Sequence, residues 1–589
     1  MTDPILYTIA APMPASHRFH VTLDIPRPAT SGQRLALPSW IPGSYLVRDF
    51  ARHVGRVSAS DARGAVAVSK VDKSTWRCAP CAGPLRVQYD VFAWDLSVRG
   101  AHLDATHGFF NGSNVFLAVA GREGDPVDVM LVEPPVAGKA WRVATTLARG
   151  DAPQWGFGLY KASDYDELID HPVEMGQFDL VDFDAAGVPH RVVLSGRHFC
   201  DGPRLAKDLA LICEQQVSLF GELPQMDQYL FLTRVLGDGY GGLEHRSSTA
   251  LMCRRGDLPG RDDKVSKEYR RFLGLASHEY FHLWNIKRIK PAAFTPYDLE
   301  QESYTQLLWV FEGITSYYDD LALVRSGVID TPSYLELVSE IMARVLSVPG
   351  HRWQSLAESS FDAWTKFYKP NEDTPNSVVS YYAKGALVAM LLDLTIRERT
   401  VDRVSLDDVM RQMWTRYGKT GLGVPEDGFE VLCEAVTGLD LGPFFDRYIR
   451  STDEPDLERA LKSVGISLTC DITPAPDVAL GLVLKKDTTE IATVYRDRAA
   501  ELGGLAPGDV LVAIDALQVT SSNWPVLVAP YAPGDRATVH AFRGDELHAV
   551  EVTFEASPQR RWRLLADDDV TPAVAARRAR WLHEEPPTA

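Results

Sequence analysis

The chain has few cysteines, a deficit of positive charge and no long apolar run. Its 589 residues include seven scattered cysteines, and only Cys78 and Cys81 lie close together, without a second pair to complete a structural zinc site. An odd number without a regular framework excludes a disulfide scaffold and suits a reducing compartment. Lysine and arginine total 61 against 79 acidic residues, a net charge of −18, which argues against a nucleic-acid or anionic-membrane partner.

Targeting signals are also missing from the sequence. Residues 1–4 do not begin a basic stretch followed by an apolar core, so no signal peptide is visible. No uninterrupted apolar span is long enough to cross a bilayer. We therefore expect a cytoplasmic protein without a membrane partner, or a periplasmic or secreted one if a leader precedes this sequence.

The length exceeds what one hydrophobic core holds, and the pattern changes along the chain. Short alternating apolar runs between turn residues predict an all-β, sandwich-like domain over 1–168. Mixed strand and helix patterns follow over 169–330, and amphipathic helices over 331–455. A smaller domain is expected over 465–557, with a C-terminal tail over 558–589 whose last stretch, 573–585, is a charged helix or a tail. The fold class is therefore multidomain α+β.

The run His278-Glu279-Tyr280-Phe281-His282 is the strongest functional signal. The sequence predicts a helix over 266–289, which ends before Pro291. Two histidines four apart on a helix project from one face and can bind one metal ion, and the glutamate beside them can take a proton from water. The alternative is a core helix with two satisfied histidines.

A catalytic zinc ion needs a third protein ligand and an open position. Glu312 is a lone carboxylate in the apolar run 308–318, which predicts a second buried helix, and a buried carboxylate needs a cationic partner. Glu312 is therefore the candidate third ligand, unless it pairs with an arginine or lies at a helix surface. Asn285 and Asp319 follow the ligands at spacings that suit partners of the ligand side chains.

A glycine-rich segment precedes the metal motif and ends in a carboxylate. Gly241 and Gly242 allow the backbone to approach a ligand closely, and Glu244 can pair with a substrate ammonium. The competing interpretation is a turn with a solvated glutamate.

A tyrosine lies downstream at the start of an apolar helix. Tyr382 can direct its phenol at a developing oxyanion. A purely structural tyrosine at a helix N-terminus explains the sequence equally well.

Taken together, these segments resemble the gluzincin aminopeptidases, and more closely the glycyl aminopeptidase family. The matching positions are His278, Glu279, His282, Glu312, Glu244 and Tyr382, and the segments 38–50 and 109–112 look like signatures of the same family. The segment 499–514 resembles a PDZ domain through its Gly-Leu-x-Pro-Gly-Asp run. His245 and Leu243 depart from the aminopeptidase N pattern, which has asparagine and methionine there.

The resemblance implies a thermolysin-like catalytic domain with one zinc ion and a C-terminal PDZ-like domain. His278, His282 and Glu312 would hold the metal, Glu279 would be the general base, and Tyr382 would stabilise the oxyanion. Glu244 would bind the free amine of a peptide substrate, and small first residues such as glycine or alanine are expected. The alternatives are a PDZ-guided zinc endopeptidase and a PDZ-centred binding protein with a degenerate peptidase domain. The PDZ-like domain would bind a peptide ligand or make an intramolecular contact.

Overall fold

A computed structural model describes residues 3–136, 140–262, 264–473, 480–556 and 559–583. The chain divides into two compact units. Unit 1 comprises residues 1–303, 318–329 and 410–425, and unit 2 comprises residues 304–317, 330–409 and 426–589. Among the described residues, no helix is both long and apolar enough to span a membrane.

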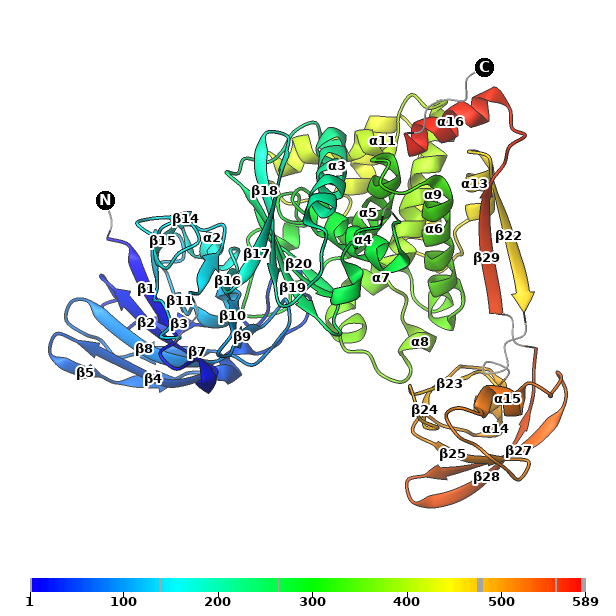
Figure 1. The fold of residues 1–589 in the computed structure, drawn as a ribbon, viewed down its shortest axis with the longest axis horizontal. Helices are drawn as coiled ribbons and strands as arrows, with labels where there is room; N and C mark the ends of the chain where they lie inside the picture. The colour runs from blue at the N-terminus through cyan, green and yellow to red at the C-terminus, as the bar shows by residue number, and fades with distance from the viewer. Residues whose placement is uncertain (1–2, 137–139, 263, 474–479, 557–558, 584–589) are drawn as a thin grey trace. The chain divides into compact units, whose positions relative to one another are not determined.

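Unit 1 begins with an eight-stranded sheet (Figure 1). In sheet order its strands are β14 (Ala148–Arg149), β15 (Gly158–Ala162), β12 (Val127–Leu131), β1 (Ile5–Ala10), β2 (Arg18–Ile25), β8 (Leu85–Phe92), β4 (Val54–Asp61) and β5 (Gly64–Val66). Alternate residues of β1 and β2 are buried, as the period of a strand with one covered face requires. The predicted β-rich N-terminal domain is confirmed.

Two four-stranded sheets complete this domain. The first contains β13 (Arg142–Ala144), β16 (Val173–Gly176), β10 (His107–Phe110) and β9 (Ala101–Leu103), and the second contains β11 (Ala118–Val119), β3 (Arg34–Ala36), β7 (Thr75–Cys78) and β6 (Val68–Lys70). The short helices are α1 (Gly112–Val115) and α2 (Tyr165–Ile169). Strand β16 pairs with β10 and β13, so the β-domain continues past the boundary expected at residue 168.

A mixed five-stranded sheet follows in unit 1 and carries the metal motif's helix. Its order is β17 (Phe178–Ala185), β18 (Val188–Ser195), β19 (Tyr229–Leu236), β21 (Ser248–Arg254) and β20 (Gly241–Glu244), with helices α3 (Gly202–Phe220) and α4 (Lys267–Phe281) beside it (Figure 1). Tyr280 of α4 stacks on Phe231 of β19 at 6.1 Å between ring centroids. Phe220 of α3 stacks on Trp284, just beyond α4, at 4.5 Å. Aromatic packing therefore fixes α4 against both the sheet and α3.

Helix α4 is shorter than predicted. It begins at the Ser266 cap and ends at Phe281, so His282 occupies the C-cap and the expected continuation to Ile289 is wrong. Ile286 has a φ of +88°, and its amide donates to the Ile289 carbonyl at 2.9 Å. This local reversal ends the helix before Pro291 is reached, and no glycine or proline between His282 and Lys290 signals it.

The helices between residues 331 and 462 confirm the predicted helical domain. They are α6 (Thr331–Leu346), α7 (Leu356–Phe361), α8 (Thr374–Ser377), α9 (Ala383–Thr400), α10 (Leu406–Met413), α11 (Gly428–Thr437), α12 (Gly442–Tyr448) and α13 (Leu457–Lys462). In unit 2, a Cβ atom added to Gly313 would lie 2.7 Å from the Gly385 Cα. These two glycines let the backbone before α5 (Ile314–Arg325) touch α9.

The last part of unit 2 contains a small module with its own hydrophobic core. Its elements are β23 (Leu482–Leu484), β24 (Ile491–Val494), α14 (Ala499–Gly503), β25 (Val510–Ile514), β26 (Leu517–Gln518), α15 (Trp524–Val528), β27 (Arg536–Arg543) and β28 (Glu546–Thr553). This is the region that resembles a PDZ domain, and that resemblance stays a prediction. Residues 474–479 and 557–558 of this region lie outside the described residues.

The described part of the segment 558–589 contains a strand and a helix, and the helix agrees with the charged helix expected as one alternative over 573–585. Strand β29 (Gln559–Ala566) pairs along its length with β22 (Ile466–Thr473), on the other side of the small module in sequence (Figure 1). Helix α16 (Pro572–Leu582) buries Trp581 completely, and the Trp581 indole donates to the Tyr317 hydroxyl at 2.8 Å. The charged composition of this segment does not reveal which of its apolar residues are buried, so the sequence alone could not decide between a helix and a tail.

Candidate metal site

Helix α4 brings His278 and His282 together at its C-terminal end. Their rings lie 4.7 Å apart between centroids. With Glu312 they form a group whose three ligand atoms all lie within 4.8 Å of one another. Two imidazoles and one carboxylate are the donor set of a catalytic zinc site, so the residues present fit that metal.

Each imidazole is oriented by a hydrogen bond from its other nitrogen. The Nδ1 of His278 lies 2.9 Å from Asp319 Oδ2, and the Nδ1 of His282 lies 2.8 Å from the Asn285 carbonyl oxygen. This arrangement fixes the ring orientation and makes Nε2 the atom that would bind a metal. Asp319 contributes its side chain, as predicted, whereas Asn285 contributes its backbone carbonyl.

Glu312 lies in a π-helical turn, Trp309–Gly313, that continues directly into α5. Its side chain is buried, with 2% exposed. Asp319 follows on the same unbroken helix, about two turns later. Asp319 also contacts α4 through its carbonyl, which accepts a hydrogen bond from Ser277 Oγ at 2.8 Å. Single π-turns inside helices are frequent at functional sites, and no residue pattern in the apolar run 308–318 predicts this one.

Glu279 and Glu244 meet beside the second histidine. With His282 they form another group whose ligand atoms lie within 4.8 Å of one another. Glu279 is 5% exposed. A Cβ atom added to Gly242 would collide with the Glu279 carboxylate, so only glycine lets strand β20 pass so close to the predicted base.

Glu244 is a buried carboxylate at the edge of the five-stranded sheet. It is the last residue of β20, it is 4% exposed, and its Oε1 atom is buried without a hydrogen-bond partner. The alternative of a turn with a solvated glutamate is therefore wrong. No described residue forms an ion pair or hydrogen bond with this carboxylate, and a buried carboxylate without donors is a favourable place for a cation.

Two features around Glu244 were not found from the sequence. Gly43, in the segment 38–50, has a φ of +91°, and an added Cβ would lie 2.5 Å from both carboxylate oxygens of Glu244. On the other side, His245 Nδ1 and Lys287 Nζ lie 3.1 and 2.7 Å from Asp170 Oδ1. Burial raises the pKa of Asp170, but Lys287 and His245 help to hold that pKa well below its usual value. This network fixes the chain just after Glu244.

Tyr382 directly precedes α9, as predicted. It is half-buried, its ring stacks on Phe367 at 5.6 Å, and its hydroxyl lies 3.1 Å from the Tyr368 hydroxyl. Lys384, the second residue of α9, is buried, and burial lowers its pKa to about 8. The role of Tyr382 at an oxyanion stays a prediction.

Family comparisons match two parts of the chain. Residues 6–177 match the model of the peptidase M61 N-terminal domain, and residues 271–388 match that of the M61 glycyl aminopeptidase. The second range contains His278, Glu279, His282, Glu312 and Tyr382. A search of curated proteins found no match.

Solved structures extend the likeness over the whole chain. A crystal structure of an aminopeptidase N family protein from Idiomarina loihiensis is 40% identical, covers 98% of this chain and 100% of its own, and has a TM-score of 0.93. A variant of the M1 zinc metallopeptidase from Deinococcus radiodurans, bound to a Tyr-Ser-Ala substrate, is 16% identical and covers 77% of this chain and 95% of its own, with a TM-score of 0.47. The second likeness is too distant to inform the chemistry. The first, the family models and the zinc-type donor set together show that this chain belongs to the M61 glycyl aminopeptidase family and is a zinc metallopeptidase of the aminopeptidase type.

Proposed function

We propose that the enzyme removes single small residues, glycine or alanine, from the free N-termini of peptides. In this proposal His278, His282 and Glu312 hold one zinc ion. The observation that carries the proposal is the buried Glu244 carboxylate, which has no donor among the described residues and lies beside Glu279. An endopeptidase has no need of a buried anion at this position.

Glu279 is the proposed general base. Zinc, when bound, lowers the pKa of water and polarises a carbonyl group. Glu279 takes the proton of the attacking water and passes it to the departing amine, which requires its carboxylate to reach both groups in turn. Its burial and its proximity to His282 support this role.

Glu244 is the proposed binding group for the substrate's ammonium. A charge-assisted hydrogen bond to a buried carboxylate is roughly twice as strong as a neutral one. Gly241 and Gly242 bring the backbone of β20 to the same place, so a peptide can lie along this strand edge with its amine at Glu244. Because the chain end is held there, cleavage follows the first residue.

Tyr382 is the proposed oxyanion donor. Its phenol lies at the start of α9 and close to a second hydroxyl, that of Tyr368. A phenol that donates to the developing oxyanion contributes about a hundredfold or more to turnover in comparable sites.

A preference for small first residues has two supports. The matching family model describes a glycyl aminopeptidase. In this chain, the Gly43 backbone lies directly against the Glu244 carboxylate, which restricts the space next to a bound amine. Side chains larger than a methyl group would then have to displace this loop.

Two measurements test the proposal. The Glu279→Gln variant keeps one bound zinc per chain and loses hydrolysis of glycyl and alanyl anilides. Wild-type enzyme cleaves free peptides and leaves their N-acetylated counterparts intact. Equal cleavage of acetylated and free peptides would refute the exopeptidase assignment and favour a PDZ-guided endopeptidase instead. A panel of aminoacyl anilides then measures the preference for the first residue.

A further inference from the structure

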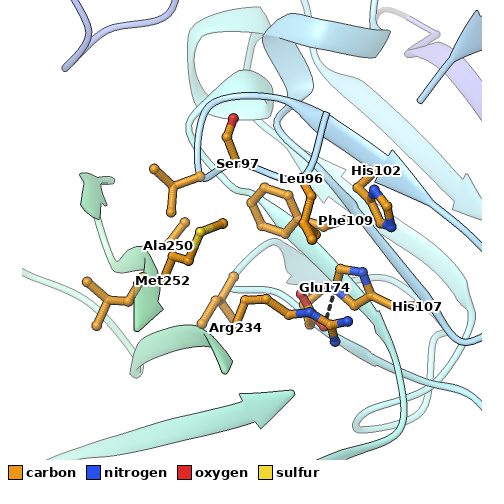
Figure 2. A pocket seen from close by; sticks show the side chains of 12 residues that line it. Leu96, Ser97, His102, His107, Phe109, Glu174, Arg234, Ala250 and Met252 are labelled. Carbon is orange, nitrogen blue, oxygen red and sulfur yellow. Dashed lines mark hydrogen bonds and ion pairs between the residues drawn. The ribbon is translucent and has the colours of Figure 1, made fainter. Parts of the chain in front are cut away.

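A separate cavity lies inside unit 1, between the β-domain and the five-stranded sheet. It opens to solvent on one side, and its empty space of about 310 Å³ includes part of that open side. Figure 2 shows side chains from both walls directed into it, with the polar groups gathered toward one side. The lining residues are Leu96, Ser97, Val98, His102, His107, Phe109, Glu174, Leu232, Arg234, Ala250, Leu251 and Met252.

Strand pairing explains how the polar residues share one wall. In the small sheet Phe109 of β10 pairs with Glu174 of β16 and with His102 of β9, and directly paired residues lie on the same face. His107 precedes Phe109 by two residues and so lies on that face too. On the opposite wall Arg234 of β19 pairs with Met252 of β21, and Leu232 pairs with Ala250.

Arg234 differs from the other charged residue of this cavity in that it lacks an ion-pair partner among the described residues. In the described part of the chain, no carboxylate lies within salt-bridge distance of its guanidinium, and its Nε atom is buried without a hydrogen bond. The carboxylate across the cavity is already engaged, because Glu174 lies 2.9 Å from His107 Nε2. A guanidinium that lines a cavity without a carboxylate partner is suited to an anionic ligand.

The two histidines add further unused polar atoms. His102 and His107 are 4% and 3% exposed, and the Nδ1 atom of each is buried without a partner. Burial lowers the pKa of His102. A neutral imidazole can donate or accept a hydrogen bond, so these rings can complete the contacts of a polar head group.

Apart from Ser97, the remaining lining is apolar. It consists of Leu96, Val98, Phe109, Leu232, Ala250, Leu251 and Met252. A ligand that fits must therefore combine one anionic head group with a short apolar body. A dianion such as phosphate suits the cavity less well than a monoanion, because Glu174 repels two charges more strongly than one and phosphate has no apolar group to cover the walls.

We propose that this cavity binds a small monocarboxylate with a short apolar tail, and that Arg234 holds the carboxylate. The inference does not depend on the peptidase reaction, since no lining residue belongs to the proposed catalytic set. Simple branched carboxylic acids and free apolar amino acids share this chemistry and are the two candidate sources.

Isothermal titration of the zinc-loaded full chain tests the proposal. The probes are 3-methylbutanoate, its neutral amide and L-leucine. The acid should bind about tenfold or more tightly than the amide, because the amide lacks the charge that Arg234 recognises. L-leucine that binds as well as the acid identifies free amino acids as a source, and acid binding alone identifies simple carboxylic acids.

Three variants locate the binding. Arg234→Gln should weaken binding of the acid about tenfold or more, and Leu96→Trp should abolish it by filling the cavity. Leu96 is 39% exposed, so this change disturbs no core. Arg63→Gln, an exposed arginine of the same domain, is the control and should bind like wild type. Hydrolysis of a glycyl anilide by each variant verifies that it is folded. Unchanged affinity in both Arg234→Gln and Leu96→Trp, or an amide that binds as tightly as the acid, would overturn the proposal.

Discussion

Replacement of Gly43 by alanine should impair catalysis more than it impairs folding. The added Cβ would lie 2.5 Å from both oxygens of the Glu244 carboxylate, so one of the two groups must move. The carboxylate is the end of a flexible side chain and can rotate away at modest cost. Rotation would remove the proposed anchor of the substrate amine while the fold stays intact.

The size of the effect follows from what Glu244 loses. A hydrogen bond to a charged group contributes about 1.5–3 kcal/mol, which corresponds to roughly a 10-fold to 100-fold change in kcat/KM. The positive φ of Gly43 adds a separate cost of about 1–2 kcal/mol to the free energy of unfolding for any residue with a Cβ. These two costs must be measured separately.

Gly121→Ala is the matched control. Gly121 lies in the same unit with a φ of +80°, and an added Cβ there meets no heavy atom within 4 Å. Both variants should lose similar stability in urea unfolding, but only Gly43→Ala should lose kcat/KM on glycyl anilide. If kcat/KM of the two variants agrees within about twofold, the position of Glu244 does not control amine binding, and the reasoning fails.

Three further predictions concern the hydrogen-bond partner of His278, a buried lysine and helix α16. Asp319→Asn should weaken zinc affinity about 10-fold to 100-fold in a chelator competition, since Asp319 orients His278; unchanged affinity would contradict this role. Because burial lowers the pKa of Lys384 to about 8, the unfolded chain binds an extra proton between pH 8 and 10.5, so stability rises with pH in that window. Lys384→Met should reduce that rise by about 1.4 kcal/mol per pH unit in denaturant titrations, and equal slopes would refute it. Trp581→Phe should lower the free energy of unfolding by about 1–2 kcal/mol, because the hydrogen bond to Tyr317 is lost in a buried place; a change under about 0.3 kcal/mol would show that α16 is only loosely held.

The two histidine ligands could be predicted because their spacing along the sequence is enough to bring them together on a helix. His278 and His282 need only one helical turn to meet, and α4 provides it even though it ends at Phe281. Glu312 was identified by contrast, as a single carboxylate in an apolar run. A carboxylate in such a run is expected to be buried and therefore to need a cationic partner, and the structure confirms that Glu312 is buried.

Contacts between distant segments could not be predicted in this way. Gly43 and Glu244 lie about two hundred residues apart in sequence, and local periodicity does not reveal that they are in contact. The Asp170 network that fixes His245 depends on the same kind of contact. The sequence left helix α16 open between a charged helix and a tail, because only three of its residues are buried. Strand β29 was missed because the whole small module separates it from its partner β22.

Strand β20 shows why a short motif needs its structural context. Side chains alternate along a strand, so Gly242 and Glu244 face one side while Gly241 and Leu243 face the other. An added Cβ at Gly242 would meet Glu279, whereas one at Gly241 would approach Val98 and Arg99, and Leu243 joins the apolar core of the β-domain.

The pairing of β20 with β21 therefore decides which residues reach the site. A slip of one residue would bury Glu244 in apolar surroundings and turn Leu243 toward Glu279. The observed register, Glu244 opposite Thr249, prevents this, and the Thr249 hydroxyl donates to the Leu243 carbonyl at 3.0 Å. Thr249→Val would remove that hydrogen bond at nearly constant volume. In the proposed function, the specificity for free N-termini thus depends on strand register as much as on Glu244 itself.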